Sequence, residues 1–364
     1  MTAVRSDWPP WECHSEDVEP GLPKRIVDMG NATSSLTSTI AAMALSEDRV
    51  TWFTNTFEAM TQNMERAILG KRNVIHLALT CLVSEGHLLL EDYPGTGKTM
   101  LARSLAATID GSHARIQFTP DLLPSDVTGV TVYEQQRGAF QFHPGPIFHG
   151  IVLADEINRA SPKTQAALLE VMEEGHVTVD GVTHEVPQPF MVIATQNPIE
   201  QAGTYRLPEA QLDRFLMKSS VGYPDAQATE DLLQDAKTRD RAGLIKPIMS
   251  TDLIESMSAI ADEVYVDPAI ITYVRELAEA SRDADHVKLG LSVRGCLALI
   301  RVCKTWAVAN GRSYVVPQDV ADLAHPVLGH RLILDGEAVF RGVDIDEVID
   351  GLLKQVAAPA VRKQ

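Results

Sequence analysis

The middle of the chain alternates short apolar runs with stretches of helical periodicity. The apolar runs are GHLLLED, ARIQF, IVLADE and FMVIATQN, and the helical stretches between them include TMLARSLAATI and SPKTQAALLEVMEE. Buried strands that alternate with helices are typical of a parallel sheet covered by helices on both faces. The pattern therefore predicts an α/β domain over residues 48–223.

Two segments inside this domain alternate at a period of two residues instead. VTVYEQQRGAFQFH, Val130–His143, does so around QQRG, and HVTVDGVTHEV, His176–Val186, does so around an Asp-Gly pair. Asp-Gly is a favoured dipeptide of tight hairpin turns. We therefore predict two β-hairpins inserted into the α/β domain.

After Tyr223 the strand signals stop. TDLIESMSAIADEV, DPAIITYVRELAEASRDA, SVRGCLALIRVCKTWAVANG and PQDVADLAHPVL follow one another as predicted helices, several with Asp, Ser or Pro at their start. This predicts an all-helical second domain over residues 224–364. Residues 1–47 are rich in proline and then in Ser, Thr and Ala, without a long amphipathic period, so we expect a disordered tail.

Composition and charge exclude several classes of protein. The formal net charge of −17 argues against the basic face that a nucleic-acid-binding protein normally carries. The four cysteines form no CxxC pair, so neither a disulfide framework nor a zinc ribbon is indicated. The sequence has no apolar run of roughly 18 residues and no signal-peptide layout at its start, so we expect a cytoplasmic protein without membrane insertion.

The strongest chemical signal is a phosphate-binding loop in LLLEDYPGTGKT. It follows a predicted strand and opens a predicted helix, as a P-loop does, so its backbone N–H groups and the helix N-terminus can bind phosphate oxygens. Lys98 would reach the β- and γ-phosphates, and the Thr99 hydroxyl would ligate Mg²⁺. Asp92 stands where the usual pattern has glycine, so the loop must begin in a conformation that Asp tolerates.

Two further strands end in polar side chains. IVLADE ends in Asp155 and Glu156. Asp155 is placed to hold Mg²⁺ through its water shell, and Glu156 is placed to polarise an attacking water molecule. FMVIATQN ends in Asn197, whose amide could hold the water or the γ-phosphate if the strands are neighbours. The alternative is that Asn197 is a turn residue before Pro198, which a strand end without the neighbouring motifs would favour.

Several long blocks of the sequence resemble the MoxR family of AAA+ ATPases. They are GHLLLEDYPGTGKT, QFTPDLLPSDVTGV, GPIFHGIVLADEINRASPKTQAALLEVMEE and FMVIATQNPIEQAGTYRLPEAQLDRF, within a match of about residues 60 to 330. The resemblance implies an AAA+ P-loop αβα sandwich with a five-stranded parallel sheet and inserted hairpins, followed by a helical lid, with ATP between them. Asp92 also occurs in this family's version of the loop.

The resemblance also implies roles for individual residues. Asp155 and Glu156 match the Walker B pair, Asn197 matches sensor 1, and Thr99 and Asp155 would hold Mg²⁺. Arg214 matches the arginine finger that acts on a neighbouring subunit's ATP, and Arg294 matches the sensor 2 arginine of the lid, although Val293 replaces the usual proline before it. Lys98, Glu156, Asn197, Arg214 and Arg294 would be catalytic. The nucleotide would be bound by Ile68, Leu69, Gly70, Asp92, Pro94, Gly95, Thr96, Gly97, Lys98, Thr99, Met100 and Arg294.

The function that the resemblance implies is Mg²⁺-dependent ATP hydrolysis by a homo-oligomeric, hexameric ring that remodels, matures or activates protein clients. A von Willebrand factor A domain protein is the expected partner. Phe140 and Phe142 fall on one face of the first predicted hairpin and could grip a client or pack against a neighbouring subunit. Two alternatives stay open: a chelatase-type motor subunit, which its partner would reveal, and a nucleic-acid-dependent motor or transcription regulator, which the charge argues against.

Overall fold

A computed structural model describes residues 45–93, 95–197, 205, 207–224, 226–234 and 241–360. The predicted tail therefore lies outside the described residues up to position 44, and Pro94 also lies outside them. The boundaries predicted at 47/48 and 223/224 stay predictions.

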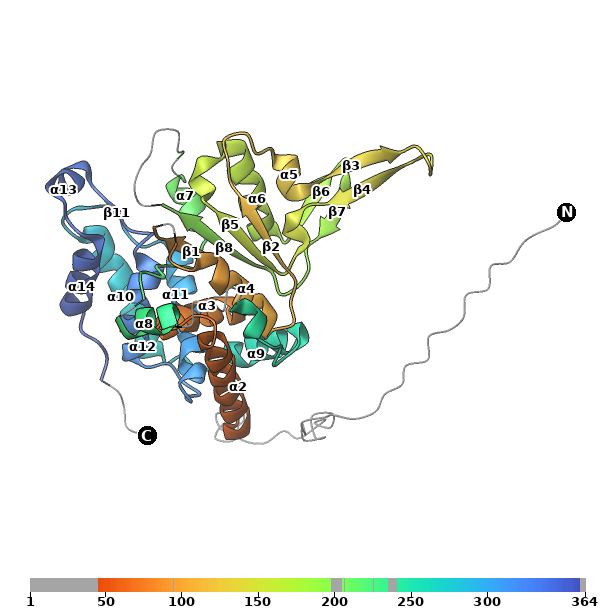
Figure 1. The fold of residues 1–364 in the computed structure, drawn as a ribbon. Coiled ribbons are helices and arrows are strands. Elements are labelled where there is room, and N and C mark those ends of the chain that lie inside the picture. The colour runs from red at the N-terminus through yellow and green to blue at the C-terminus, as the bar shows by residue number, and fades with distance from the viewer. Residues whose placement is uncertain are drawn as a thin grey trace, which may run out of the picture. The chain divides into compact units, whose positions relative to one another are not determined.

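The centre of the α/β region is a five-stranded parallel sheet, as the sequence predicts (Figure 1). Its strands lie in the order β2 (His113–Gln117), β5 (Ile151–Asp155), β8 (Met191–Gln196), β1 (Leu88–Glu91) and β9 (Met217–Ser219). Neighbouring strands in this order are not consecutive in the chain. The segments that join consecutive strands therefore cross a face of the sheet, and they contain helices that cover it. All five strands end at the same edge, which we call the carboxyl edge, and begin at the opposite one, the amino edge.

Both faces of the sheet are buried. Leu88 and Leu90 of β1 pack into one apolar cluster with α3 (Arg72–Val83) and α4 (Lys98–Thr108). Leu89, between them, points to the other face and packs with α5 (Pro124–Thr128) and α6 (Pro162–Glu174). This alternation follows from the two-residue period of a strand, and it explains why the strand sequences are apolar throughout.

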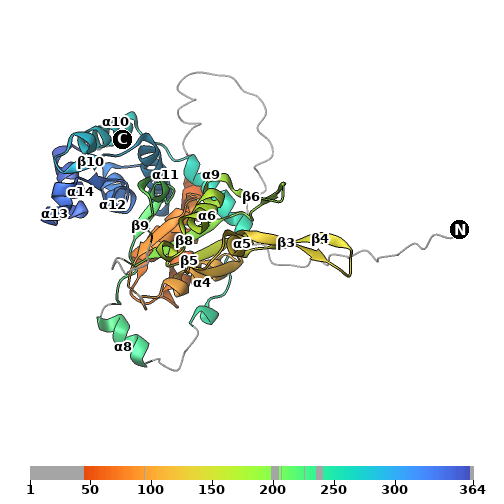
Figure 2. The same cartoon turned by 90° about the horizontal axis from the view of Figure 1, so that it is seen from above.

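Both inserted hairpins are present. β3 (Gly129–Glu134) pairs antiparallel with β4 (Ala139–Pro144), and β6 (His176–Val179) pairs antiparallel with β7 (Val182–Glu185). Asp180 and Gly181 have φ of 50° and 80°, as the tight turn between β6 and β7 requires. Figure 2 shows the β3–β4 hairpin extending away from the sheet.

The described residues of the C-terminal region are mainly helical. Its helices are α8 (Ala226–Gln234), α9 (Thr251–Asp262), α10 (Pro268–Asp283), α11 (Val293–Ala309), α12 (Pro317–Leu328), α13 (Gly336–Arg341) and α14 (Ile345–Gln355). β10 (Val287–Leu289) and β11 (Ile333–Leu334) form an antiparallel pair that the sequence analysis did not predict, because strands this short leave no periodic signal. Single helical turns lie at α7 (Glu209–Leu212), Pro146–Phe148, Ile157–Arg159 and Ala242–Leu244.

The first described helix, α2 (Glu47–Glu65), joins the two regions. Its buried residues Phe53, Phe57, Met60 and Met64 recur at helical spacing and belong to the apolar cluster that includes both α4 and α11. None of the helices in the described residues is long and apolar enough to cross a membrane.

Candidate active site

The phosphate loop joins β1 to α4 at the carboxyl edge. Gly95 and Gly97 have φ of +87° and +97°, the left-handed region that L side chains rarely adopt. A Cβ at either position would meet none of the described atoms within 4 Å, so the backbone conformation, not crowding, requires glycine here. The open space beside both glycines lets a ligand approach the backbone closely.

Lys98 is the first residue of α4. Its Nζ lies 3.2 Å from the carbonyl oxygen of Asp92 and 3.0 Å from that of Tyr93, so the ammonium group folds back over the loop. Thr99 follows in the first helical turn, where N–H groups are free of intrahelical partners and favour anions. Thr96 is buried and its hydroxyl donates to the carbonyl of Tyr93, and Met100 packs against the apolar core.

Asp92 is buried, with 4% of its surface exposed, and its carboxylate is hydrogen-bonded to the backbone. It accepts hydrogen bonds from the backbone N–H groups of Val221 and Gly222, the latter at 3.0 Å. These residues follow β9, at the start of the connection to the C-terminal helices. Asp92 therefore fastens the phosphate loop to that connection, which is the physical reason why an aspartate stands where P-loops usually have glycine.

Ile68, Leu69 and Gly70, which the sequence predicts to bind the nucleotide, lie close to this contact of Asp92. Ile68 is buried and Gly70 has a φ of 67° at the turn between α2 and α3. The next residue, Lys71, donates from Nζ to the carbonyl of Tyr223, one residue after Gly222. The structure thus brings Ile68, Leu69 and Gly70 toward the segment that Asp92 holds.

Asp155 ends β5 and Glu156 follows it directly. A residue that was not identified from the sequence, Thr195, contacts both. The buried Thr195 hydroxyl of β8 donates to Oδ1 of Asp155 at 2.7 Å and accepts from the backbone N–H of Glu156 at 2.8 Å. Arg115 of β2 donates to Oδ2 of Asp155 from both Nε, at 3.2 Å, and Nη2. Neighbouring strands on both sides therefore hold this carboxylate in place.

Glu156 has φ 55° and ψ 49°, a left-handed conformation that is uncommon for a residue with a side chain. Its Oε2 accepts from Nε2 of Gln117 at 3.0 Å and from Nη1 of Arg159 at 2.7 Å. Backbone strain at a polar residue is frequent at functional sites. Gln117 ends β2, and its position at a strand end was the signal that would have identified it.

Asn197 directly follows β8, next to the start of the phosphate loop. The backbone N–H of Asp92 donates to the carbonyl of Gln196 at 3.1 Å, so the residue after Gln196 lies beside the residue that opens the loop. The parallel sheet therefore gathers Lys98, Thr99, Asp155, Glu156 and Asn197 at one edge, as the sequence predicts.

Arg214 and Arg294 do not join this group. Arg214 precedes β9 and pairs with Oε2 of Glu173 at 2.9 Å, and Arg294 of α11 pairs with Oε1 of the same carboxylate at 3.2 Å. Glu173, in the last turn of α6, was not identified from the sequence. Only the fold could reveal it, because its two partners are far away in the chain.

This arginine pair lies at the amino edge of the sheet. β9 runs parallel to β1, so Arg214, which precedes β9, is on the side where β1 begins. His87, just before β1, hydrogen-bonds through Nε2 to the carbonyl of Met172, next to Glu173. The four-residue strand β1, ~13 Å long, separates this edge from the phosphate loop of the same chain.

The aromatic residues of the first hairpin have separate environments. Phe142 stacks on His184 of the second hairpin, with ring centroids 4.0 Å apart, an intrachain contact that the sequence analysis did not anticipate. Phe140 is 76% exposed and meets Tyr133, itself 51% exposed, edge to face. Of the two phenylalanines, Phe140 is therefore the one available to a partner.

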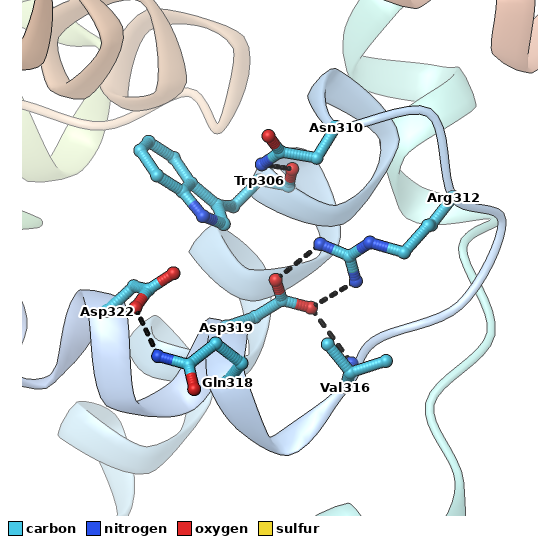
Figure 3. Close-up of a pocket in the computed structure, with 7 residues that line it drawn as sticks. All are labelled: Trp306, Asn310, Arg312, Val316, Gln318, Asp319 and Asp322. Carbon is cyan, nitrogen blue, oxygen red and sulfur yellow. Dashed lines mark hydrogen bonds and ion pairs between the residues drawn. The ribbon is translucent and has the colours of Figure 1, made fainter. Parts of the chain in front are cut away.

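A pocket where α11 meets α12 contains none of the predicted site residues (Figure 3). Arg312 and Asp319 form a two-point ion pair across it, at 2.7 and 2.6 Å, and Asp319 also accepts from the backbone N–H of Val316. The ion pair stabilises the start of α12. Because the two charges neutralise each other, the pocket offers no unpaired charge from this pair to a ligand.

The residues at the carboxyl edge fit a nucleoside triphosphate with Mg²⁺. The glycine backbone leaves space for phosphates beside Lys98. Mg²⁺ prefers oxygen donors, and the Thr99 hydroxyl and, through a water molecule, the Asp155 carboxylate would hold it. Asp155 accepts three hydrogen bonds from Thr195 and Arg115, and a carboxylate has about four acceptor positions, so one remains for a metal-bound water.

Comparison with known proteins agrees with this geometry. Residues 87–217 match the model of the ATPase family associated with various cellular activities, and residues 279–361 match an AAA lid domain. The chain is 45% identical to the uncharacterized protein YeaC of Bacillus subtilis, over 83% of this chain and 94% of the relative. It is 40% identical to Chaperone MoxR1 of Mycobacterium tuberculosis, over 84% of this chain and 83% of that relative.

A solved structure matches as well. A Cytophaga hutchinsonii protein assigned as an ATPase aligns with a TM-score of 0.81 at 34% identity, over 89% of this chain and 100% of that one.

Proposed function

Because the chain belongs to the MoxR family of AAA+ ATPases, we propose that it hydrolyses ATP with Mg²⁺ in a closed ring of identical subunits and uses this cycle to remodel or activate partner proteins. The observation that carries the proposal is the separation of the site into two halves. The phosphate loop, Asp155 and Glu156 lie at the carboxyl edge, and Arg214 and Arg294 lie at the amino edge.

This separation favours assembly. Since the two arginines are a strand length from the phosphate loop of their own chain, we assign both to the nucleotide of a neighbour. A head-to-tail contact that joins the amino edge of one subunit to the carboxyl edge of the next provides this, and repeated around an axis it closes a ring. For Arg294 this assignment differs from a lid arginine that acts on its own subunit's ATP.

Each residue then has a chemical role. The loop N–H groups and Lys98 bind and orient the phosphates, and the Thr99 hydroxyl and, through a water molecule, the Asp155 carboxylate would hold the metal. Mg²⁺, when bound, neutralises charge on the β- and γ-phosphate oxygens. Glu156, oriented by Gln117 and Arg159, takes up the proton of the attacking water, and arginines from the neighbour stabilise the charge that develops.

The chaperone function rests on the relative named Chaperone MoxR1 and on the exposed tip of the β3–β4 hairpin. Phe140 and Tyr133 form an apolar pair that suits an unfolded or partner segment, and we propose this pair as the client contact. A von Willebrand factor A domain protein is the proposed partner.

Phe140→Ala is expected to leave basal ATP hydrolysis unchanged and to remove its stimulation by a client.

The first test separates binding from hydrolysis. Lys98→Ala is expected to abolish nucleotide binding, because the phosphates lose their ammonium contact. Glu156→Gln is expected to bind ATP and to lose turnover by two or more orders of magnitude, because the amide cannot accept the proton. Isothermal titration with ATP and a phosphate-release assay measure both. Full turnover in Glu156→Gln would remove Glu156 from its role.

The second test asks whether the arginines act between subunits. Arg214→Ala is expected to keep nucleotide affinity and to lose roughly 10³-fold in hydrolysis. Adding Glu156→Gln subunits, which keep Arg214, should partly restore turnover at the Arg214→Ala sites. Arg275→Ala is the matched control, because Arg275 pairs with Glu276 and Glu279 on the exposed side of α10 and should change neither quantity. Absence of any restoration would contradict the shared site.

A further inference from the structure

We propose that Glu173 is a positioning residue that holds Arg214 and Arg294 together for the phosphates of the neighbouring subunit, an inference that rests on the shared site proposed above. Each oxygen of this one carboxylate takes one of the two guanidinium groups, Arg214 at 2.9 Å and Arg294 at 3.2 Å. The three residues come from three separate elements: the end of α6, the approach to β9 and the start of α11.

The surroundings explain why a carboxylate is needed. The cavity beside the pair is also lined by Arg301, Lys304 and Arg331, so cations predominate there. Asp213 accepts from Nε of Arg331 at 2.7 Å and lies 3.9 Å from Nε of Arg294, so its charge is already shared with a buried arginine. Without Glu173, Arg214 and Arg294 would have no comparable charge between them and would repel each other.

The accessibility of the cluster suits an incoming anion. The side chains of Arg214, Glu173 and Arg294 are 27%, 36% and 51% exposed, so they are neither sealed in the core nor free in solvent. A free arginine side chain loses conformational entropy when it is fixed. Glu173 fixes both side chains before the neighbour arrives, and preorganised charges contribute most to a transition state.

Steady-state ATP hydrolysis tests the proposal. In Glu173→Gln one oxygen becomes an amide that repels a guanidinium, so kcat is expected to fall about tenfold while KM for ATP stays unchanged, because the phosphate loop is untouched. Glu173→Asp keeps the charge but is one methylene shorter, and an intermediate kcat is expected. Glu174→Gln is the matched control on the next, exposed position and should match the parent protein. Circular dichroism melting checks that each variant is folded.

Mixed rings show in which subunit Glu173 acts. The acceptor is Arg214→Ala, and the donor is either Glu156→Gln or the double variant Glu156→Gln/Glu173→Gln. We expect the single-variant donor to restore turnover in the acceptor and the double variant to restore several-fold less, because Glu173 would act through the donated arginines.

The outcomes distinguish the two proposals. Equal restoration by both donors, or a kcat for Glu173→Gln equal to that of Glu174→Gln, overturns the role of Glu173 and leaves the shared site standing. No restoration by either donor overturns the shared site, and the role of Glu173 falls with it. A rise in KM at unchanged kcat would also overturn the proposal, since it would place Glu173 in the binding of its own subunit's nucleotide.

Discussion

Thr195 contacts both Asp155 and Glu156 with a single hydroxyl group. It donates to the carboxylate of Asp155 and accepts from the backbone N–H of Glu156, and it is fully buried. The left-handed backbone of Glu156 costs about 1–2 kcal/mol for a residue with a Cβ. The hydrogen bond that the Glu156 N–H donates to the Thr195 hydroxyl helps to offset this cost, so Thr195 stabilises the backbone that carries the Glu156 side chain.

We predict that Thr195→Val lowers hydrolysis about tenfold and leaves ATP affinity unchanged. The valine has nearly the same shape but leaves the N–H of Glu156 unpaired, and such a loss costs about 1–3 kcal/mol. Thr195→Ser keeps the hydroxyl and should restore most of the rate. Phosphate release and ATP titration measure the two effects, and a Thr195→Val protein with parental kcat would refute the prediction.

Asp92 is the second residue whose role is local and specific. We expect Asp92→Ala to lower the free energy of unfolding by about 1–3 kcal/mol, because the buried N–H of Val221 and the partly buried N–H of Gly222 lose their acceptor. ATP affinity should fall as well, since the phosphate loop loses its fastening. Urea unfolding and ATP titration test this, with the exposed Glu170→Ala on α6 as a control that should change stability by less than about 0.5 kcal/mol. Equal stability of the two variants would contradict the prediction.

At the scale of elements, the hairpins are held by contacts at their bases and sides. At the base of the β3–β4 hairpin, a Cβ on Gly129 would lie 2.4 Å from the carbonyl oxygen of His143, and one on Gly145 would lie 2.3 Å from that of Val127. Along its side, Phe142 stacks on His184 of β7. The first hairpin is therefore fixed at its root, and its apolar tip is left exposed.

We predict that Gly145→Ala releases the base of the hairpin, because the added methyl group collides with backbone atoms that cannot move aside. Hydrogen exchange of amides in 129–144 should accelerate by at least tenfold. Gly138→Ala at the hairpin turn is the control: its φ of +63° is strained for alanine, but the site is open, so a cost of about 1 kcal/mol without loss of the hairpin is expected. Unchanged exchange in Gly145→Ala would show that the contact is not limiting.

At the scale of the whole molecule, buried polar groups tie the C-terminal helices to the amino edge of the sheet. The side chain of Arg331, 3% exposed, pairs with Asp213 and donates to the carbonyl of Phe215 at 2.7 Å. His330 hydrogen-bonds through Nε2 to the same carbonyl at 2.9 Å, and His87 joins the start of β1 to α6 and β8. Arg331 pairs with Asp213, the residue before Arg214. These groups therefore stabilise the amino edge, which we propose contacts the neighbouring subunit.

These histidines predict loss of stability in acid. Burial lowers the pKa of His87 to about 4 and that of His330 well below its usual value, so the unfolded chain, with pKa near 6.5, binds more protons than the folded one. The free energy of unfolding should therefore fall as pH drops from about 6.5 toward 4, by roughly 3 kcal/mol for His87 alone.

His325 opposes this trend. Burial lowers its pKa, but hydrogen bonds to Asp346 and Asp350 outweigh burial and raise it, so its contribution is present below pH 6.5 and is lost as pH rises through the folded pKa. Urea unfolding at pH 7.5 and 5.0 measures the net effect, which we expect to be destabilising at pH 5.0. His87→Gln should flatten the dependence, and an unchanged slope would exclude His87 as its source.

The chain's local patterns were sufficient for the fold class, both hairpins and the position of the phosphate loop between β1 and α4. The information for these lies within a few neighbouring residues, in the period of apolar positions and in glycines that a turn requires. Parallel strands also share one edge by geometry, so Asp155, Glu156 and Asn197 could be placed beside the phosphate loop before any coordinates were known.

The contacts that orient those residues depend instead on how distant segments meet. Thr195 reaches Asp155 because β8 lies next to β5 in a particular register, and Glu173 meets Arg214 and Arg294 because α6, β9 and α11 converge at the amino edge. The same convergence puts the arginines across the sheet from their own phosphate loop. Strand order and helix packing result from the burial of the whole apolar surface, a property of the complete chain that no short segment carries.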